Sequence, residues 1–165
     1  MKRFFLTALV TSLMLMTTLS FAKTFEYPGQ DPIFAITFPD DWNIDVDEEL
    51  LNAMPADSSI YLGLWAMDGV ENLEAAFEAL DESFADLITD VECDDPEAIE
   101  INDIQIITID GKGKTTDGAV DIVLSVALFS PDDETIFVVL AFGTPEAEKK
   151  HSEALGSIVN SIQAK

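Results

Sequence analysis

The chain has 165 residues, with 32 acidic side chains against 8 basic ones and a formal net charge of −24. Nucleic acids and anionic membrane surfaces require a basic footprint on the proteins that bind them, so this charge excludes both as partners. Divalent cations, an unknown basic protein, or no partner at all remain open, and in the last case the charge serves solubility.

The N-terminal segment, residues 1–22, has the features of a secretory signal peptide. Lys2 and Arg3 are followed by an almost unbroken apolar run, and small residues stand at the two positions that a signal peptidase reads. The pattern predicts cleavage after Ala22 and export to a periplasm or the extracellular space, with no membrane insertion afterwards. A retained anchor is disfavoured because the run is short for a bilayer. The mature chain, residues 23–165, keeps 6 basic residues against 32 acidic ones, a net charge of −26, and is the size of one domain.

The first half of the mature chain predicts two strands and one long helix. Residues 33–38 are rich in β-branched and aromatic side chains and stop at Pro39, which predicts a strand followed by a turn. Residues 45–56 are ambiguous, with a short helix as one interpretation. Residues 59–67 predict a strand that is apolar on both faces, and residues 70–89 predict an amphipathic helix that packs on a sheet.

Two segments on either side of these elements are polar. Residues 23–31, which precede the first strand, are interpreted as a polar entry segment, and residues 90–97, which follow the helix, are interpreted as an acidic loop. Residues 99–101 and 104–109 then give two further strand signals. The second signal runs into the sequence GKGK at residues 111–114, where glycines weaken a strand and indicate a bulge or a twisted end.

A long hairpin and a terminal helix complete the chain. Residues 120–142 predict two strands around a turn, and the second arm, residues 136–142, is apolar at every position. Such a strand requires cover on both of its faces. Thr144 as N-cap and Pro145 at the first helical position then predict the start of the last helix.

Together these elements predict an α+β fold. The expected architecture is a three-layer α/β/α sandwich, in which a mostly antiparallel central sheet of about six strands has helices on both faces.

The order of elements resembles the PsbP-like and DcrB-like exported proteins. The resemblance rests on residues 38–42 (FPDDW), on the strand at residues 59–67, on the long helix and hairpins, and on residues 158–162 (IVNSI), and it spans residues 31–162. It implies the α/β/α sandwich of that family, which a Ran-binding nuclear import factor shares. The functions it implies are accessory ones, such as stabilising a photosynthetic manganese and calcium site or binding a small GTPase. It carries over no catalytic residues.

Single residues with chemical potential are few. Trp42 and Trp65 are interpreted as core residues, with ligand stacking as the alternative. His151 is the sole histidine and is interpreted as a packing residue, since a zinc site lacks enough suitable ligands. Cys93, the sole cysteine, has acidic neighbours that disfavour a reactive thiolate. Residues 111–114 resemble a phosphate-binding loop only superficially, because they lead into a strand rather than a helix.

Two acidic clusters are the candidate metal-binding residues. Calcium and similar hard cations take several oxygen ligands from flexible loops, and each cluster supplies them. Neither matches the EF-hand template, and a solvated acidic surface is the competing interpretation. The first cluster is Asp45, Asp47, Glu48 and Glu49, and the second is Glu92, Asp94, Asp95 and Glu97.

The sequence thus predicts a non-enzymatic exported accessory or binding domain of PsbP-like type, with no catalytic residues and no cofactor. The alternative is a divalent-cation protein that binds calcium or manganese through the acidic loops. A third hypothesis, an enzyme that uses the tryptophan and histidine positions, has no motif to support it.

Overall fold

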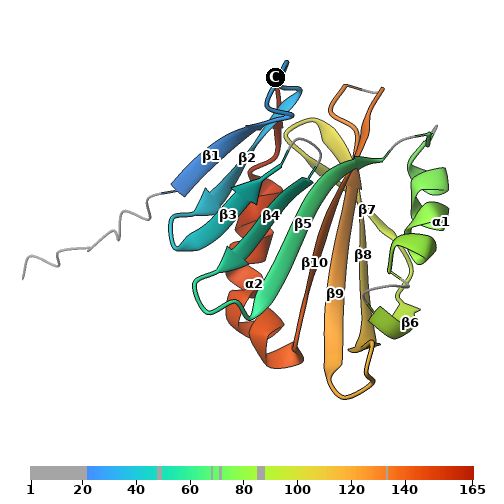
Figure 1. The fold of residues 1–165 in the computed structure, drawn as a ribbon. Coiled ribbons are helices and arrows are strands. Elements are labelled where there is room, and N and C mark those ends of the chain that lie inside the picture. Colours follow the sequence, from blue (N-terminus) through green and yellow to red (C-terminus); the bar gives the residue numbers. More distant parts are fainter. Residues whose placement is uncertain (1–21, 48–49, 68, 71, 85–87, 133) are drawn as a thin grey trace, which may run out of the picture.

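The computed structural model describes residues 22–165 except 48–49, 68, 71, 85–87 and 133. Over these residues the chain forms eleven strands and two helices (Figure 1). The helices are α1, Leu73–Phe84, and α2, Pro145–Asn160. The strands are β1 Ala22–Tyr27, β2 Phe34–Pro39, β3 Trp42–Val46, β4 Leu50–Pro55, β5 Ile60–Met67, β6 Ile88–Cys93, β7 Glu97–Ile101, β8 Ile104–Thr115, β9 Asp121–Phe129, β10 Ile136–Gly143 and β11 Gln163–Ala164.

The strands are arranged in two sheets whose described pairings are all antiparallel. The larger sheet has 8 strands in the order β3-β4-β5-β10-β9-β8-β6, and β7 also pairs with β8. The smaller sheet has 3 strands in the order β1-β2-β11. The predicted hairpin of β9 and β10 therefore lies at the centre of the larger sheet.

Strand β10 confirms the prediction of a strand that is covered on both faces. Its residues 136–141 are each at most 6% exposed. Phe137 and Val139 belong to one core cluster, whereas Val138 and Leu140 belong to another on the opposite face of the sheet. Because successive side chains of a strand point to opposite faces, an all-apolar strand joins two cores.

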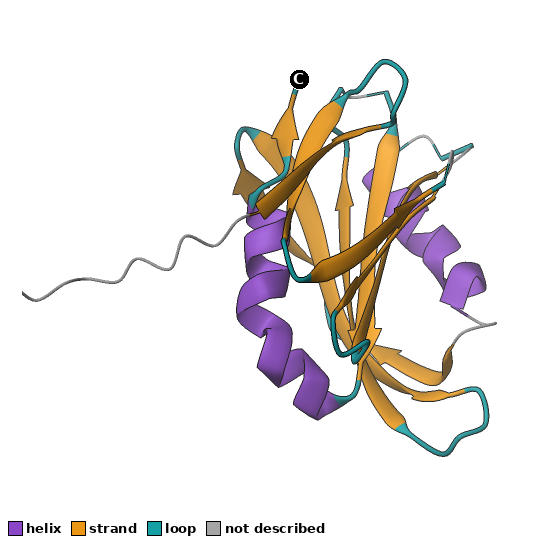
Figure 2. Ribbon diagram, turned by 60° about the vertical axis from the view of Figure 1, so that its left-hand side comes forward, coloured by secondary structure: helices purple, strands orange, loops and turns teal. Residues whose placement is uncertain are grey.

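Different elements cover the two faces of the larger sheet. On one face the core includes Phe34 and Ile36 of the smaller sheet and Ile158 of α2. On the other face it includes Ala76 and Leu80 of α1. Figure 2 shows the two helices on opposite sides of the strands.

The predicted three-layer α/β/α sandwich with a central sheet of about six strands is wrong. The protein is mostly antiparallel β, with eleven described strands in two sheets and two short helices. The smaller sheet lies beside α2 over one core, so that strands take up a layer that was assigned to helix.

Three of the missed strands lie in polar segments. Residues 23–31, expected as an entry segment, contain most of β1, and residues 90–97, expected as a loop, contain the end of β6. Residues 45–56, for which a short helix was one interpretation, contain β4 instead. β1 and β6 are edge strands whose acidic residues interrupt the apolar alternation. β4 is different, because β3 and β5 pair with it on both sides and its six residues include no acidic one.

The predicted helix at residues 70–89 is too long at its C-terminal end. Helix α1 ends at Phe84, and Ile88 and Thr89 already belong to β6. Ile88 is 2% exposed and packs in the same core cluster as Ala76 and Leu80 of α1. Because it is apolar and falls at helical spacing from Leu80, the sequence pattern placed it in the helix although it lies in a strand. Leu87 lies outside the described residues.

The glycines of residues 111–114 lie inside β8 and allow close approach of β6. A Cβ atom on Gly113 would lie 2.6 Å from Cγ2 of Ile88, and one on Gly111 would lie 2.9 Å from the carbonyl oxygen of Glu92. The register of the β6–β8 pair shifts between Thr89 and Glu92, with the extra residue on β6, so the irregularity lies opposite the glycines, while residues 111–114 themselves continue β8 in regular register with β9.

Helix α2 begins as predicted. The backbone N–H of Ala147 donates to the hydroxyl of Thr144 at 3.2 Å, and Pro145 opens the helix. The first turns are also tied to the turn between β4 and β5, where the carboxylate of Asp57 contacts Lys150 and, at 3.3 Å, Nε2 of His151. The hydrogen bond from Lys150, followed by those from Ser59, holds the pKa of Asp57 well below its usual range.

We expect Val138→Asp to abolish folding. Val138 is fully buried, so a carboxylate at this position could not reach solvent on either face of the sheet. Burying this unpaired charge would cost a free energy comparable with the whole stability of a domain, about 5–15 kcal/mol. Circular dichroism and a urea titration measure the effect. The matched control is Val120→Asp, because Val120 is 43% exposed and precedes the same hairpin. A folded Val138→Asp variant would refute the two-sided burial of β10.

We expect Asp57→Asn to lower the free energy of unfolding at neutral pH and to leave it unchanged in acid. A depressed pKa stabilises the fold above the unfolded-state value of about 3.9, and the stabilisation disappears as the pH falls through the folded-state pKa. Urea midpoints across this range measure the difference, with exposed Asp45→Asn as the control. A difference that grows on acidification would contradict the ion-pair contribution.

Candidate functional site

A groove of about 300 Å³ lies between α2 and the outer part of the larger sheet. One wall is α2, the floor is formed by β5, β9 and β10, and the far wall is the β7–β8 hairpin. This space exists because α2 contacts β2, β5, β9 and β10 and does not extend over the whole width of the sheet.

Small side chains keep the groove open. Ser125 and Ala127 of β9 and Ala141 of β10 line its floor, and Ser152 and Gly156 of α2 line the facing wall. A Cβ atom at Gly156 would have no neighbour within 4 Å. Close packing therefore does not require glycine at position 156. Glycine is nevertheless present, although it destabilises a helix by about 0.5–1 kcal/mol relative to alanine.

Larger apolar side chains form the two walls. Ile99 and Ile101 of β7 stand on the sheet side, and Leu155 and Val159 stand on α2. Ile99 is 39% exposed, which makes it one of the few large apolar side chains that the described structure leaves in contact with solvent. The walls of the groove are therefore apolar, and Ile99 is their most exposed member.

One end of the groove is acidic. Asp110 of β8 and Glu148 of α2 line this end together with Ser125, whose hydroxyl donates to Oδ1 of Asp110 at 2.5 Å. The same three residues also line a neighbouring hollow of about 590 Å³, which continues to Glu92 and Asp94. An apolar channel thus opens into a hollow that is rich in carboxylates, and we call the two together the α2 groove.

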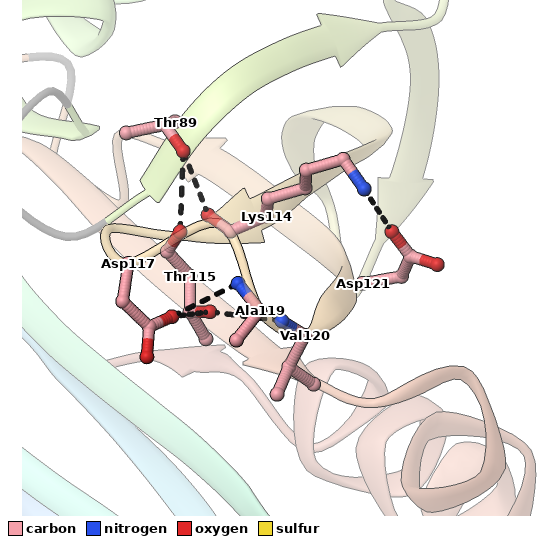
Figure 3. A network of polar contacts seen from close by, with 7 residues as sticks. All are labelled: Thr89, Lys114, Thr115, Asp117, Ala119, Val120 and Asp121. Carbon is pink, nitrogen blue, oxygen red and sulfur yellow. Dashed lines mark hydrogen bonds and ion pairs between the residues drawn. The ribbon is translucent and has the colours of Figure 1, made fainter.

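The two lysines of residues 111–114 have carboxylate partners. Nζ of Lys112 lies 2.8 Å from Oε2 of Glu92, and this pairing lowers the pKa of Glu92 and raises that of Lys112. Nζ of Lys114 lies 2.6 Å from Oδ1 of Asp121 (Figure 3). Since both ammonium groups are paired along strands, the segment does not form the cradle that a phosphate loop requires.

Figure 3 also shows what holds the β8–β9 turn beside these lysines. Oδ1 of Asp117 accepts hydrogen bonds from the Thr115 hydroxyl at 2.5 Å and from the backbone N–H of Ala119 at 3.0 Å. These bonds lower the pKa of Asp117. The hydroxyl of Thr89 donates to the Thr115 carbonyl at 3.2 Å, so β6 is fastened to the same turn.

The structure separates the two predicted acidic clusters. Asp45 lies on β3, at one edge of the larger sheet, and Asp47 follows that strand, while Glu48 and Glu49 lie outside the described residues. The second cluster lies at the opposite edge: Glu92 on β6, Asp94 and Asp95 in the following turn, and Glu97 at the start of β7. Over the part of the chain that the structure describes, no three such side chains gather as a metal-ligand set. Cation binding stays a prediction.

The two tryptophans take packing positions, and Cys93 lies at the surface. Trp42 is 2% exposed and its ring lies edge-on to His151, with centroids 6.2 Å apart. Trp65 is partly buried against the core beneath α1. Cys93 is exposed and lines the acidic hollow.

Sequence reasoning missed the residues that define the α2 groove. Glu148, Ser152 and Gly156 are spaced by four residues, which places them on one stripe of α2 beside the buried stripe. Asp110 and Ser125 interrupt apolar alternation on the same face of two paired strands. Both signals were present in the sequence, but only the packing of α2 on the sheet shows that they meet.

Comparisons with known proteins identify the fold. No family model and no curated protein matches the chain. The solution structure of cyanobacterial PsbP (CyanoP) from Synechocystis is similar with a TM-score of 0.60 and 10% identity, over 91% of this chain and 96% of that one. LpqN of Mycobacterium tuberculosis, involved in cell envelope biogenesis, has a TM-score of 0.55 and 13% identity, over 86% and 90%.

A third structure, from Bacteroides thetaiotaomicron, has a TM-score of 0.60 and 14% identity over 87% of this chain, and this chain spans 48% of that protein. The predicted resemblance to PsbP-like proteins is confirmed at the level of the fold. Among the described residues, neither helix has the length and apolar composition needed to span a bilayer.

We expect Gly156→Ala to raise the free energy of unfolding by about 0.5–1 kcal/mol, because alanine lowers the entropy of the unfolded chain and its Cβ meets no atom in the groove. Urea denaturation measures the gain. Gly143→Ala is the opposite control, since its Cβ would lie 2.6 Å from Cδ1 of Ile60 and should destabilise the protein. A loss of stability at position 156 would show that the groove is closed there.

Proposed function

We propose that this protein is a non-enzymatic, exported binding domain that holds an apolar, positively charged segment of a partner in the α2 groove. The observation that carries the proposal is the continuity of an apolar channel with an acidic hollow at Asp110 and Glu148. Ligand sites in proteins are mostly concave and apolar, with a few polar groups that fix orientation, and start at about 300 Å³.

Charge supports a basic ligand. The chain carries a net charge of −24, and the groove's open end adds Glu92, Asp94, Asp110 and Glu148 against one lysine, Lys112, which is paired. A field of one sign over a hollow attracts ions of the opposite sign and speeds their arrival. The ligand's apolar part would then pack between Ile99 and Leu155, with its cation towards the carboxylates.

A binding role also accounts for the polar chemistry of the groove better than catalysis does. The hydroxyl of Ser125 donates to Asp110, so it has an acceptor but no imidazole beside it. The sole histidine, His151, contacts Asp57 and Trp42 instead. Activated serine nucleophiles require an adjacent general base with a third group that orients it.

The predicted signal peptide and the comparisons support export and an accessory role. CyanoP and LpqN share the fold, and LpqN is involved in cell envelope biogenesis. An accessory domain in an envelope compartment would meet basic segments of neighbouring proteins without needing a reaction of its own.

The proposal is tested with n-octylamine, which is cationic near neutral pH, against neutral n-octanol and anionic octanoate. Methyl NMR spectra should shift at Ile99, Ile101 and Leu155, and octylammonium should bind about threefold to tenfold more tightly than octanol because of the carboxylates. Replacing both Asp110→Asn and Glu148→Gln should remove that difference.

The matched pair Gly156→Ala and Gly156→Leu locates the ligand. Alanine should leave binding nearly intact, whereas leucine should occupy the channel and abolish it while the helix remains folded. Equal binding of octylammonium and octanol would contradict the role of the acidic end. Unchanged binding by Gly156→Leu would show that the ligand lies elsewhere.

A further inference from the structure

Strand β7 is an edge strand next to the α2 groove. Within the described residues it pairs with β8 alone, and its residues 97–100 are exposed. Ile99 and Ile101 line the groove, so by strand alternation Ala98 and Glu100 point to the other face of the sheet. The unpaired side of β7 therefore borders the apolar wall directly.

The hairpin turn determines which backbone groups of β7 face outward. Asn102 and Asp103 have φ values of 51° and 66°, as a two-residue type I′ turn requires, and Ile101 pairs with Ile104. Residues that flank such a turn exchange their backbone hydrogen bonds, and the pattern alternates along the ladder. Ile101 and Ile99 consequently bond to β8, while the N–H and C=O groups of Ala98 and Glu100 are directed away from it.

The edge is held in place before any ligand arrives. The side chain of Asn102 donates to the carbonyl of Asn160, the last residue of α2, at 3.3 Å and to that of Ile162, just beyond the helix, at 2.7 Å. At the other end of β7, the hydroxyl of Thr108 donates to the carbonyl of Glu97 at 3.4 Å. A strand fixed at both ends loses little entropy when another strand pairs with it.

We propose that the partner segment binds as an extended, basic peptide strand that pairs antiparallel with β7 and extends the larger sheet. The proposal rests on the binding function assigned to the α2 groove and specifies its ligand. Side chains opposite Ile99 and Ile101 lie on the groove side and are apolar, and those opposite Glu97 and Glu100 are basic. Strand addition of this kind obtains affinity from the backbone and specificity from alternate side chains.

Charge favours a basic peptide over a second copy of this chain. An antiparallel β7–β7 pair would bring Glu97 and Glu100 of two copies close together, next to Asp94 and Asp95 of each. Like charges across a strand pair are destabilising, and each copy carries a net charge of −24. A lysine-containing strand meets the same carboxylates with attraction.

The test uses a capped peptide containing Val-Lys-Val-Thr-Lys, which in antiparallel register places valines opposite Ile101 and Ile99, threonine opposite Ala98 and lysines opposite the two glutamates. Its affinity is measured by calorimetry. N-methylation of the threonine removes an N–H that donates to β7 and should weaken binding about fivefold to tenfold. N-methylation of the second valine, whose N–H points away from β7, should have little effect.

Protein variants test the same contact from the other side. Ala98→Pro removes an outward N–H and leaves the bonds to β8, so it should fold and show the same loss, whereas Ala98→Val should bind like the parent. If Ala98→Pro fails to fold, the two N-methylated peptides decide on the unchanged protein.

Equal binding of both N-methylated peptides would overturn strand addition. The proposed function survives that result if octylammonium still binds and Gly156→Leu abolishes its binding. A β7-dependent dimer in sedimentation, lost in Ala98→Pro, would likewise overturn the proposal by naming a second copy as the occupant.

Discussion

The fold depends on a strand that has no solvent-facing side. Because β10 is apolar at successive positions, the hydrophobic effect favours burying it only if the chain supplies cover for both faces and strands for both edges. β5 and β9 take the edges, α1 covers one face, and α2 with the smaller sheet covers the other. The two helices are amphipathic and turn their apolar sides to the sheet, whereas β5, which pairs with β10, is itself apolar on both faces.

The cover over the α2 face is incomplete, and the α2 groove is the consequence. One helix and a three-stranded sheet are laid over a sheet of 8 strands, so the outer strands beyond α2 remain open to solvent. Small residues at Ser125, Ala127 and Gly156 keep the space from closing. The buried core and the groove thus lie on the same face of the larger sheet, and the groove differs from the core in the smaller side chains that line it.

The sequence predicts the strands that have long apolar runs, but it does not predict the short polar strands. β5, β9 and β10 have apolar runs that only a buried strand explains, and α2 has a capping residue and a proline that determine its start locally. β1 and β6 are strands because partners exist for them, not because of their own composition. Ile88 fits a helical stripe and a strand equally well, so tertiary packing decided between them.

The residues of the candidate site are dispersed along the chain and have no common sequence motif. Asp110, Ser125 and Glu148 belong to three separate elements, and each by itself is an ordinary polar surface residue. Their proximity is a property of register and of the position of α2. The acidic clusters, in contrast, are dense in sequence, but among the described residues neither brings three such side chains together as a metal-ligand set.

The hydrogen bonds from Asn102 to Asn160 and Ile162 give the α2 groove a mechanical asymmetry. These bonds connect the C-terminal end of α2 to the turn of the β7–β8 hairpin and hold the two walls of the groove together at that end. Towards Glu148, no side-chain hydrogen bond or ion pair between described residues joins the helix to β8, and the first turns of α2 contact the β4–β5 turn through Asp57 instead. Any opening of the α2 groove would therefore take place at the Glu148 end, where its acidic residues lie.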